Sequence, residues 1–391
     1  MVVKRKVMVI DKTAVLEKYH QKCVALAKYA DIDLTLFVPK AWIENYQKVT
    51  LQKRKDPKYE IVTGRVFFKG YENRGFYFGL SLPATVRKVK PDVILMFEEP
   101  FSLFSLQTII SKKLFAPNAK LVFYSFDNQS WNHNYSYRPS WLYKLIDLFA
   151  LRNSDYAIVS NLEAKEILIS KGFSSDSISI IPWGIDPKQF RDLDAKDKIK
   201  AELGLSGFVV GYVGRLLKMK GIHVLIEATS QLEKEHSDIM LLLVGEGPDR
   251  NNFEHMTKAK GIGRNVIFTG YVESEDLVKY YNAMDVLVLP SLTTATWKEQ
   301  LGRVLIEAMA CGTPVIGSSS GAIPEVIDDS GLVFQERNID ALKRAIFSIK
   351  QDDALRPKLV EKGKRLVQEK YTWDAFGKKV HGIITFIVER H

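Results

Sequence analysis

Cysteine, long apolar runs and an N-terminal leader are scarce or absent in this 391-residue sequence. Its two cysteines, Cys23 and Cys311, lie in apolar helical contexts without metal-ligand spacing, which favours buried thiols in a reducing compartment. The longest apolar runs are strand-length, far below the ~20 residues that cross a bilayer. The N-terminus shows neither the apolar segment nor the cleavage site of a signal peptide. We therefore expect a cytoplasmic protein without a spanning helix.

Two glycine-rich phosphate motifs are also missing. Neither the Walker pattern nor G-x-G-x-x-G occurs, which argues against an NTPase and against a nicotinamide-dependent enzyme. Positive charge is unevenly distributed: residues 1–185 hold 27 Lys+Arg against 17 Asp+Glu, whereas residues 186–391 hold 29 of each. The pI of about 9.2 suggests a nucleic-acid-binding protein, but no binding module is recognisable and the excess is confined to one half.

Strand-length apolar runs alternating with helical patterns are abundant. Continuous apolar strands separated by helices indicate a parallel sheet covered on both faces, and two such series predict two doubly wound, Rossmann-like α/β domains. We expect an N-terminal domain over 1–182, a C-terminal domain over 183–370 and a final amphipathic helix over 371–391. The expected strands are 6–11, 33–39, 92–99, 120–126, 156–161, 177–182, 208–215, 240–248, 266–272, 285–291 and 314–318. A helical pattern also covers 13–30.

The stretch "YVGRLLKMKG" follows a predicted strand and precedes a predicted helix. Gly214 permits a tight turn, Arg215 and Lys220 supply two cations, and the helix begins near Gly221. Free amides, a helix dipole and side-chain charge together are typical of a phosphate site. The alternative is an ordinary strand–turn–helix with solvated cations.

Two glutamates bracket a mostly apolar stretch in "EQLGRVLIEAMACG". Glu299 lies in the loop after a strand, Glu307 lies on a helix from about Gly302, and Gly312 is its stop signal. Eight residues of helix span roughly 12 Å, about the distance between the two sugars of a sugar nucleotide. A carboxylate can accept bonds from two adjacent hydroxyls, so each acid could hold one sugar. The alternative is that Glu307 is a surface residue of an amphipathic helix.

These stretches, with "LLLVGEGP" and "VIFTGYV", resemble glycosyltransferase family 4, whose members are retaining enzymes of GT-B architecture with two domains facing across a cleft. The resemblance implies that Arg215 and Lys220 clamp the donor diphosphate, that Glu299 contacts the transferred sugar and that Glu307 holds the ribose. It also implies that the final helix crosses back to the N-terminal domain. The remaining donor-binding residues implied by the same motifs are Gly214, Glu246, Tyr271, Val272, Leu301, Gly302 and Arg303.

Two residues depart from the family pattern, and both affect the shape of the donor site. Leu301 stands where the family often has Phe, and Trp183 stands where the linker commonly has Asn. The N-terminal half also lacks the glycine-rich loop that many relatives carry after the first strand.

Polar residues at later strand ends supply the acceptor-side candidates. They are Glu98, Glu99, Asp127, Asn128 and His133. The "EEP" stretch resembles a subset of the family that builds surface polysaccharides. The alternatives are a helix-preceding acid for Glu99 and an ordinary loop histidine for His133.

Two D-x-D patterns require attention because metal-dependent sugar transferases use one. Asp31 and Asp33 lie at the amino end of a predicted strand, the wrong end for a ligand, and Asp192 and Asp194 lie in a polar stretch past the linker. We expect no metal site.

The sequence thus predicts a retaining, metal-independent glycosyltransferase without a cofactor, which takes a UDP- or GDP-sugar as donor. The predicted acceptor is a glycan or lipid-linked molecule of cell-envelope polysaccharide synthesis. A sugar-nucleotide 2-epimerase, a phosphorylase and a non-catalytic sugar-nucleotide-binding protein remain alternatives on the same fold.

A basic run in the N-terminal half suggests peripheral contact with the anionic inner face of a membrane. It contains Lys48, Lys53, Arg54, Lys55 and Lys58, flanked by Trp42, Tyr46 and Tyr59. Aromatic side chains suit a headgroup boundary, and each cation near an anionic surface contributes about 1 kcal/mol. A solvated basic loop and a groove for a soluble anionic glycan are the alternatives.

Overall fold

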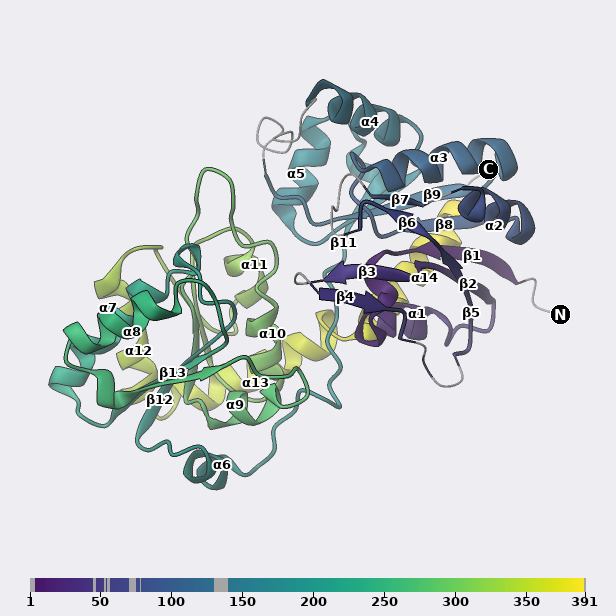
Figure 1. Ribbon diagram of the computed structural model, residues 1–391. Coiled ribbons are helices and arrows are strands. Elements are labelled where there is room, and N and C mark those ends of the chain that lie inside the picture. Colours follow the sequence, from purple (N-terminus) through teal and green to yellow (C-terminus); the bar gives the residue numbers. More distant parts are fainter. Residues whose placement is uncertain are drawn as a thin grey trace. The chain divides into compact units, whose positions relative to one another are not determined.

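The computed structural model describes residues 4–44, 47–52, 54, 57–69, 75–77, 79–129 and 140–389. The chain divides into two compact units (Figure 1). The first comprises Met1–Trp183 and Trp373–His391, and the second comprises Gly184–Thr372. Each unit has a parallel sheet with helices on both faces, which confirms the predicted pair of doubly wound α/β folds.

The first unit is built on a seven-stranded parallel sheet of order β11-β10-β9-β8-β1-β2-β5. Its strands are β1 (Arg5–Ile10), β2 (Ile32–Pro39), β5 (Glu60–Gly64), β8 (Val93–Met96), β9 (Lys120–Ser125), β10 (Tyr156–Val159) and β11 (Ile178–Ile180). Two antiparallel ribbons accompany it: β3 (Ala41–Glu44) with β4 (Gln47–Thr50), and β6 (Val66–Phe67) with β7 (Phe76–Tyr77). Strand β5 was not predicted, because this half-exposed edge strand has no continuous apolar run.

Helices cover both faces of this sheet (Figure 1). The crossover helices are α2 (Ser81–Val89), α3 (Leu103–Phe115), α4 (Ser140–Arg152) and α5 (Leu162–Ser170), with a short turn η3 (Ser175–Ser177) before β11. The other face carries α1 (Gln21–Leu26) and the last helix, α14 (Trp373–Glu389), which pack against each other. Helix α14 buries Phe376, Val380 and Ile384 in the core of the first unit.

The segment 13–30, expected to be one helix, is broken. It forms two single turns, η1 (Thr13–Val15) and η2 (Glu17–His20), before α1 begins. Leu16 is extended between the turns. Gln52 forms hydrogen bonds with two backbone groups on either side of Leu16, and these groups would otherwise bond within a continuous helix. The Gln52 N–H donates to the Val15 carbonyl at 2.8 Å, and the Gln52 side chain accepts from the Glu17 N–H at 3.1 Å. A contact distant in sequence thus overrides the helical pattern.

Trp183, in place of the family's Asn, lies among aromatic rings of the first unit. Its ring forms an edge contact with Phe126 and a tilted contact with Trp373. The fully buried Lys22 ammonium lies 4.4 Å from the Trp183 ring and 4.3 Å from the Phe97 ring, and it forms an ion pair with the buried Asp11 carboxylate. Aromatic faces attract a cation, so these rings help to solvate a charge that water does not reach.

The second unit has a six-stranded parallel sheet of order β14-β13-β12-β15-β16-β17. Its strands are β12 (Phe208–Val213), β13 (Ile239–Val244), β14 (Val266–Gly270), β15 (Val286–Leu289), β16 (Val315–Ser318) and β17 (Leu332–Phe334). Five of these were predicted. Strand β17, which is short and only partly buried, was not predicted.

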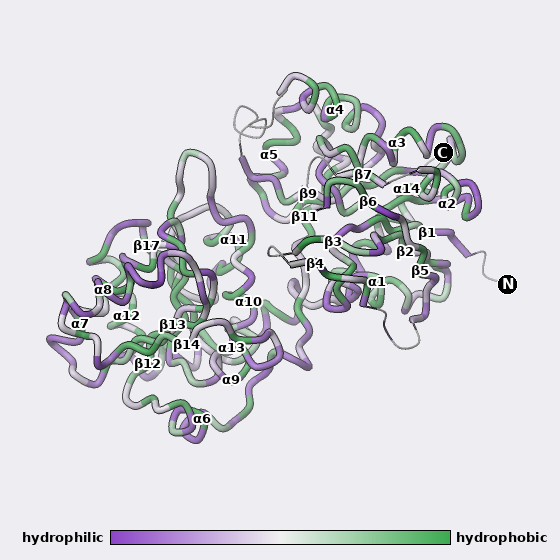
Figure 2. Tube along the Cα trace, viewed as in Figure 1, coloured by the Kyte–Doolittle hydropathy of each residue, from purple (hydrophilic) through white to green (hydrophobic). Residues whose placement is uncertain are grey.

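The helices of this unit form a layer on each face of its sheet. They are α6 (Lys196–Glu202), α7 (Ile222–Glu235), α8 (Arg250–Ala259), α9 (Leu277–Ala283), α10 (Arg303–Ala310), α11 (Ile323–Ile327), α12 (Ile339–Gln351) and α13 (Leu355–Lys370), with single turns η4 (Lys218–Lys220) and η5 (Gly263–Asn265). Helix α7 packs with α8 and α12, whereas α10 packs with α9, α11 and α13. In both units the inner strands of the sheet are mostly hydrophobic (Figure 2), as expected for sheets buried on both faces. None of the described helices combines the length and apolarity that a membrane crossing requires.

Removing one partner of the buried pair should strongly destabilise the first unit. Lys22→Met leaves the Asp11 carboxylate without its ion-pair partner inside the protein, and we expect a loss of roughly 3–5 kcal/mol of unfolding free energy. Urea unfolding followed by tryptophan fluorescence measures it. The double variant Asp11→Asn/Lys22→Met, which removes both charges, should recover most of the loss. A Lys22→Met protein as stable as the wild type would contradict the interpretation.

Candidate functional site at the carboxyl edge of the second sheet

Strand order brings two chemistry-bearing loops together in the second unit. Strand β12 pairs directly with β15, so the loop that follows β12 lies beside the loop that follows β15. Gly221 closes the first loop in the left-handed region (φ 72°), and a methyl group on it would lie 1.8 Å from the Pro290 carbonyl oxygen. A backbone hydrogen bond from Leu292 to Met219 joins the same two segments. Only glycine permits this approach.

The approach places Lys220 against Glu299. The Lys220 ammonium donates to Glu299 Oε2 at 2.7 Å and lies 4.5 Å from the centre of the Trp297 ring. The fully buried Ser291 hydroxyl donates to the same carboxylate oxygen at 2.8 Å. Glu299 itself is only 8% exposed. The two residues that the sequence placed 79 positions apart therefore form one ion pair, held by a buried hydroxyl and an aromatic face.

A third loop, after β16, encloses the Glu299 backbone. Gly321 adopts φ 53°, and a methyl group there would lie 2.1 Å from the Glu299 carbonyl oxygen. The Ala322 N–H donates to that oxygen at 3.0 Å. The small residues of "SSSGA" thus allow backbone to approach backbone at the predicted ligand edge. The Glu299 main chain is fixed by this contact, and its side chain by Lys220 and Ser291.

Arg215 lies directly after β12, as predicted, and its side chain is exposed. Within the described part of the chain, its guanidinium has neither a hydrogen-bond nor an ion-pair partner. Its carbonyl accepts from the buried Tyr212 hydroxyl at 2.8 Å, which fixes the backbone at this position. Burial, followed by the nearby Glu299 charge, raises the pKa of Tyr212, so this phenol remains a donor. Gly214 adopts φ 146°, consistent with the predicted turn.

Glu307 lies on α10, whose bounds agree with the predicted helix. It is buried, and its Oε2 accepts from the Tyr281 hydroxyl at 2.7 Å, while its Oε1 forms an ion pair with Arg303 Nε at 2.9 Å. Burial, followed by the Glu307 charge, raises the pKa of Tyr281. The interpretation of Glu307 as a fully exposed surface residue is wrong, because α9 and α10 pack around it. Gly302 precedes the helix at φ 68°.

The remaining donor-side candidates differ in exposure. Glu246, after β13, forms an ion pair with Arg250 at 2.7 Å. Tyr271 is largely exposed and donates to Glu273 at 3.2 Å, and Val272 beside it is partly buried. Leu301, in place of the family's Phe, is buried next to Gly302. Each lies in a segment that follows a strand of the second sheet, although among the described residues neither a hydrogen bond nor an ion pair joins them to Lys220.

Three contributors to this site were not predicted. Ser291 was visible at the end of "DVLVLPS", and its position after a strand was a usable signal. Trp297 stands two residues before Glu299, and the proximity of an aromatic residue to a predicted cation site was a weaker signal. Tyr281 had no signal, because only the packing of α9 on α10 brings it to Glu307.

In the first unit, Glu98 and Lys12 form a buried ion pair at the carboxyl ends of β8 and β1. The ammonium donates to Glu98 Oε2 at 2.5 Å and the Lys12 N–H donates to Oε1 at 3.2 Å. Burial raises the pKa of Glu98 to about 7, opposed by the Lys12 charge. Glu98 thus lies in the interior of the first unit, where its partner is Lys12.

The structure brings Glu99 and Asp127 together at the same edge. Glu99 accepts from the Ser125 hydroxyl at 2.6 Å and from the Phe126 N–H at 2.9 Å, and the Asp127 N–H donates to Ser125 Oγ at 3.1 Å. Burial, followed by the Asp127 charge, raises the pKa of Glu99 to about 8. The Asn128 amide donates to Glu163 at 3.1 Å. His133 lies outside the described residues.

One aspartate of each D-x-D pattern pairs with basic side chains. Asp31 pairs with Arg5 and His381, and Asp192 pairs with Lys364 at 2.8 Å. Over the part of the chain that the structure describes, no three His, Cys, Asp or Glu side chains gather in a way that could hold a metal ion.

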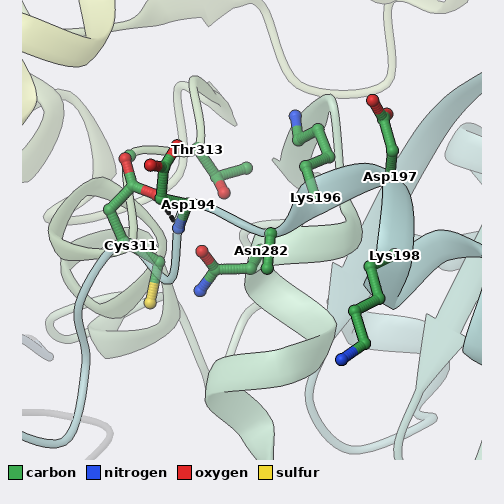
Figure 3. A pocket seen from close by; sticks show the side chains of 10 residues that line it. Asp194, Lys196, Asp197, Lys198, Asn282, Cys311 and Thr313 are labelled. Atoms are coloured by element: carbon green, nitrogen blue, oxygen red, sulfur yellow. Dashed lines mark hydrogen bonds between the residues drawn. The ribbon is translucent and has the colours of Figure 1, made fainter.

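Asp192 and Asp194 line a polar hollow of about 440 Å³ near α6, together with Lys196, Asn282 and Thr313 (Figure 3). Thr313 precedes β16, and Asn282 precedes β15. The hollow therefore lies at the amino edge of the second sheet, opposite the edge where doubly wound sheets bind ligands. We do not assign the donor site to it.

The expected aromatic flank of the basic run is wrong. Trp42 and Tyr59 are buried in the core, and the Tyr59 hydroxyl lies 2.9 Å from His20 Nδ1, so neither ring can enter a headgroup layer. Lys48 and Lys58 are exposed, whereas Arg54 lies 3.9 Å from Glu17. Lys53, Lys55 and Tyr46 lie outside the described residues. Among the described residues, the run therefore has no exposed aromatic side chain of the kind that the membrane hypothesis assumed.

The raised pKa of Glu99 gives a pH dependence of stability with a definite sign. The folded state binds this proton more tightly than the unfolded chain, so the unfolding free energy should fall as the pH rises from 4.5 to about 8. Glu99→Gln mimics the protonated carboxyl and should show a smaller fall over this range. Urea unfolding at several pH values measures the difference. The exposed Glu166→Gln should behave like the wild type, and an equal pH slope in Glu99→Gln would contradict the prediction.

Comparisons with known proteins show what the chain resembles. Residues 195–366 match the family "Glycosyl transferases group 1". An uncharacterized glycosyltransferase of Methanocaldococcus jannaschii is 32% identical over 55% of this chain and 55% of its own length. A GDP-mannose-dependent monoacylated alpha-(1-6)-phosphatidylinositol monomannoside mannosyltransferase of Corynebacterium glutamicum is 30% identical over 52% of this chain and 55% of its own length. The chain thus spans about half the length of the curated relatives that it matches.

Solved structures match over almost the whole chain. Anabaena HepE in complex with UDP has a TM-score of 0.74 at 16% identity, covering 97% of this chain and 100% of that one. A glycosyltransferase from Rickettsia africae has a TM-score of 0.75 at 18% identity, covering 99% and 100%. At these identities the likeness shows the fold. Residues 195–366 of this chain thus match the group 1 glycosyl transferases, and its two doubly wound units have the GT-B fold.

Proposed function

We propose that the protein is a retaining glycosyltransferase that transfers a sugar from a UDP- or GDP-sugar to a glycan or lipid-linked acceptor in cell-envelope polysaccharide synthesis. The observation that carries the proposal is the Lys220–Glu299 pair next to the exposed Arg215 at the ligand edge of the second sheet. Support comes from relatives named as mannosyltransferases and from HepE, whose structure holds UDP. We place the protein in the cytoplasm, with peripheral contact at the inner face of a membrane.

Charge complementarity supports a diphosphate at this edge. Arg215 and Lys220 bring two positive charges, and Glu299 balances one of them. A donor diphosphate would add negative charge and compete with Glu299 for the Lys220 ammonium. The Glu299 carboxylate would then accept bonds from hydroxyls of the transferred sugar, while Ser291 keeps it oriented. The amides at the start of α10, preceded by Gly302, would face the same anion.

The proposed reaction requires stabilisation of the leaving group above all. The acceptor hydroxyl attacks the anomeric carbon on the face from which the diphosphate leaves, and a leaving phosphate oxygen takes the proton. Negative charge develops on the diphosphate, where preorganised cations lower the barrier most effectively. We therefore assign Arg215, Lys220 and Glu299 to the reaction, with neither a metal ion nor a cofactor.

Nucleotide and acceptor would occupy separate groups of residues. Glu307, held by Tyr281 and Arg303, would accept bonds from the ribose hydroxyls, and Tyr271 and Val272 would line the base pocket. Gly214, Glu246, Leu301 and Gly302 would complete the donor site. On the first unit, Glu99, Asp127, Asn128 and His133 are the candidates for the acceptor.

Removing either cation should reduce transfer severely without unfolding the protein. Charge-assisted contacts contribute about 1.5–3 kcal/mol each, so Arg215→Ala and Lys220→Ala should each lower kcat/KM by one to two orders of magnitude, roughly 10- to 150-fold. The assay follows release of nucleoside diphosphate and appearance of glycosylated acceptor, with and without EDTA. Lys218→Ala removes an exposed cation from the same turn and is the matched control.

Three outcomes would contradict the assignment. If both variants transferred sugar at near wild-type rates, Arg215 and Lys220 would not be the residues that hold the donor diphosphate. Loss of activity in EDTA, restored by Mn²⁺ or Mg²⁺, would overturn metal independence. Turnover of the donor without any acceptor product would indicate an epimerase instead.

The two glutamates should separate by ligand. Glu307→Gln should weaken binding of the bare nucleoside diphosphate, whereas Glu299→Gln should mainly weaken binding of the intact nucleotide sugar. Isothermal titration calorimetry with both ligands measures the two effects. Tyr281→Phe keeps the Glu307 charge but removes its buried donor, so it should reproduce part of the Glu307→Gln loss. Equal losses on both ligands in both variants would refute the division of roles.

A further inference from the structure

The outer face of α3 and α4 in the first unit exposes large apolar side chains. They are Ile110 and Leu114 on α3, and Trp141, Leu142 and Leu145 on α4. Leu114 is 67% exposed, Trp141 63% and Leu145 56%. Single exposed apolar residues are ordinary, but a group of five on two neighbouring helices marks an interaction surface.

Helices α3 and α4, which carry these residues, belong to the same helical layer of the first unit. Helices α3 and α4 pack against each other, and the Lys113 ammonium on α3 lies 5.1 Å from the centre of the Phe149 ring on α4. Both are crossover helices between adjacent parallel strands, β8 to β9 and β9 to β10, so they lie on the same face of the sheet (Figure 1). Hydrophobic residues recur along both helices in Figure 2. We call this set of exposed residues on α3 and α4 the α3–α4 face.

The charges on this face have one sign. Lys113, Lys144 and Arg152 are exposed, and Lys112 is partly exposed. Asp147, the single acidic residue in the sequences of α3 and α4, is fully buried and paired with Lys171 at 2.9 Å. Neither helix therefore presents an exposed carboxylate. An apolar surface with positive charges and no exposed acid complements a partner that is apolar inside and anionic outside.

We propose that the α3–α4 face docks the protein on an anionic lipid bilayer. Trp141 and the leucines enter the boundary between headgroups and acyl chains, and Lys113, Lys144 and Arg152 meet anionic headgroups. The inference rests on the proposed function in one respect, since a lipid-linked acceptor lies in such a membrane. It replaces the basic run after β3 as the docking element, because Trp42 and Tyr59, which flank that run, are buried.

Reversible binding is expected from these residues. Each Lys or Arg near an anionic surface contributes about 1 kcal/mol, equivalent to roughly fivefold in affinity. Removing two of them should therefore weaken binding roughly 25-fold. Burial of a tryptophan and a leucine should raise the affinity for vesicles more than tenfold. Replacing both apolar side chains should therefore weaken vesicle binding about tenfold or more.

Vesicle co-sedimentation of the full chain tests the proposal. The vesicles contain either phosphatidylcholine alone or phosphatidylcholine with phosphatidylglycerol. We expect the wild type to bind the anionic vesicles, to ignore the neutral ones and to bind more weakly as salt rises. Trp141→Ser/Leu145→Ser and Lys113→Gln/Lys144→Gln should lose binding by the factors above. Lys48→Gln/Lys58→Gln changes the net charge equally on the basic run and should stay within about threefold of the wild type, because it removes only long-range attraction.

Thermal melting and nucleoside-diphosphate binding verify that the α3–α4 variants and the Lys48/Lys58 variant are folded. All substituted residues are exposed, so both readouts should match the wild type. Arg215→Ala should still bind vesicles, which separates failure of the docking surface from failure of the proposed donor site. The proposal is overturned if the wild type ignores anionic vesicles at low salt, or if the Lys48/Lys58 variant loses binding while both α3–α4 variants keep it. It is also overturned if light scattering shows a dimer that Trp141→Ser/Leu145→Ser dissolves without any change in vesicle binding.

Discussion

The pairing of β12 with β15 is the constraint on which the proposed donor site depends. Parallel strands end at the same edge, so this one pairing fixes which two loops become neighbours. Gly221 then allows the first loop to touch the Pro290 carbonyl, and Gly321 allows a third loop to touch the Glu299 carbonyl. Lys220 and Glu299 meet because the backbone beneath them is locked at both points. A side chain larger than hydrogen at Gly221 or Gly321 would separate the loops before it affected any charged group.

In the Lys220–Glu299 ion pair at this edge, an incoming anion can compete with Glu299 for the Lys220 ammonium. The Lys220 ammonium contacts the Glu299 carboxylate and the face of the Trp297 ring, whereas the Arg215 side chain is exposed just after the strand end. A partly buried pair keeps its charges close without water between them, so an incoming anion meets a cation that is already oriented. In the first unit, by contrast, burial dominates the electrostatics of the acids at the sheet edge. Burial raises the pKa of Glu98 despite its ion pair with Lys12, and burial together with the Asp127 charge raises the pKa of Glu99.

The doubly wound fold and most strands were predictable because buried parallel strands are continuous apolar runs, and this signal needs no tertiary information. The polar residues at the ends of these runs pointed to Arg215, Lys220, Glu299 and Glu99 for the same reason. The sequence did not predict β5 or β17, whose edge positions leave them partly polar, nor the break at Leu16, which depends on Gln52 from a distant loop. It also misjudged Trp42 and Tyr59, because an aromatic residue beside lysines looks the same in sequence whether it is buried or exposed.

The position of α14 has a consequence for the order in which the protein is made. Phe376, Val380 and Ile384 complete the core of the first unit, yet they are synthesised after every residue of the second unit. The second unit is continuous in sequence and can close its core while the chain is still growing. The first unit must wait with α1 uncovered until the last helix leaves the ribosome. The N-terminal half is therefore the later of the two to finish folding, and its unfinished face is the one that a chaperone would have to shield.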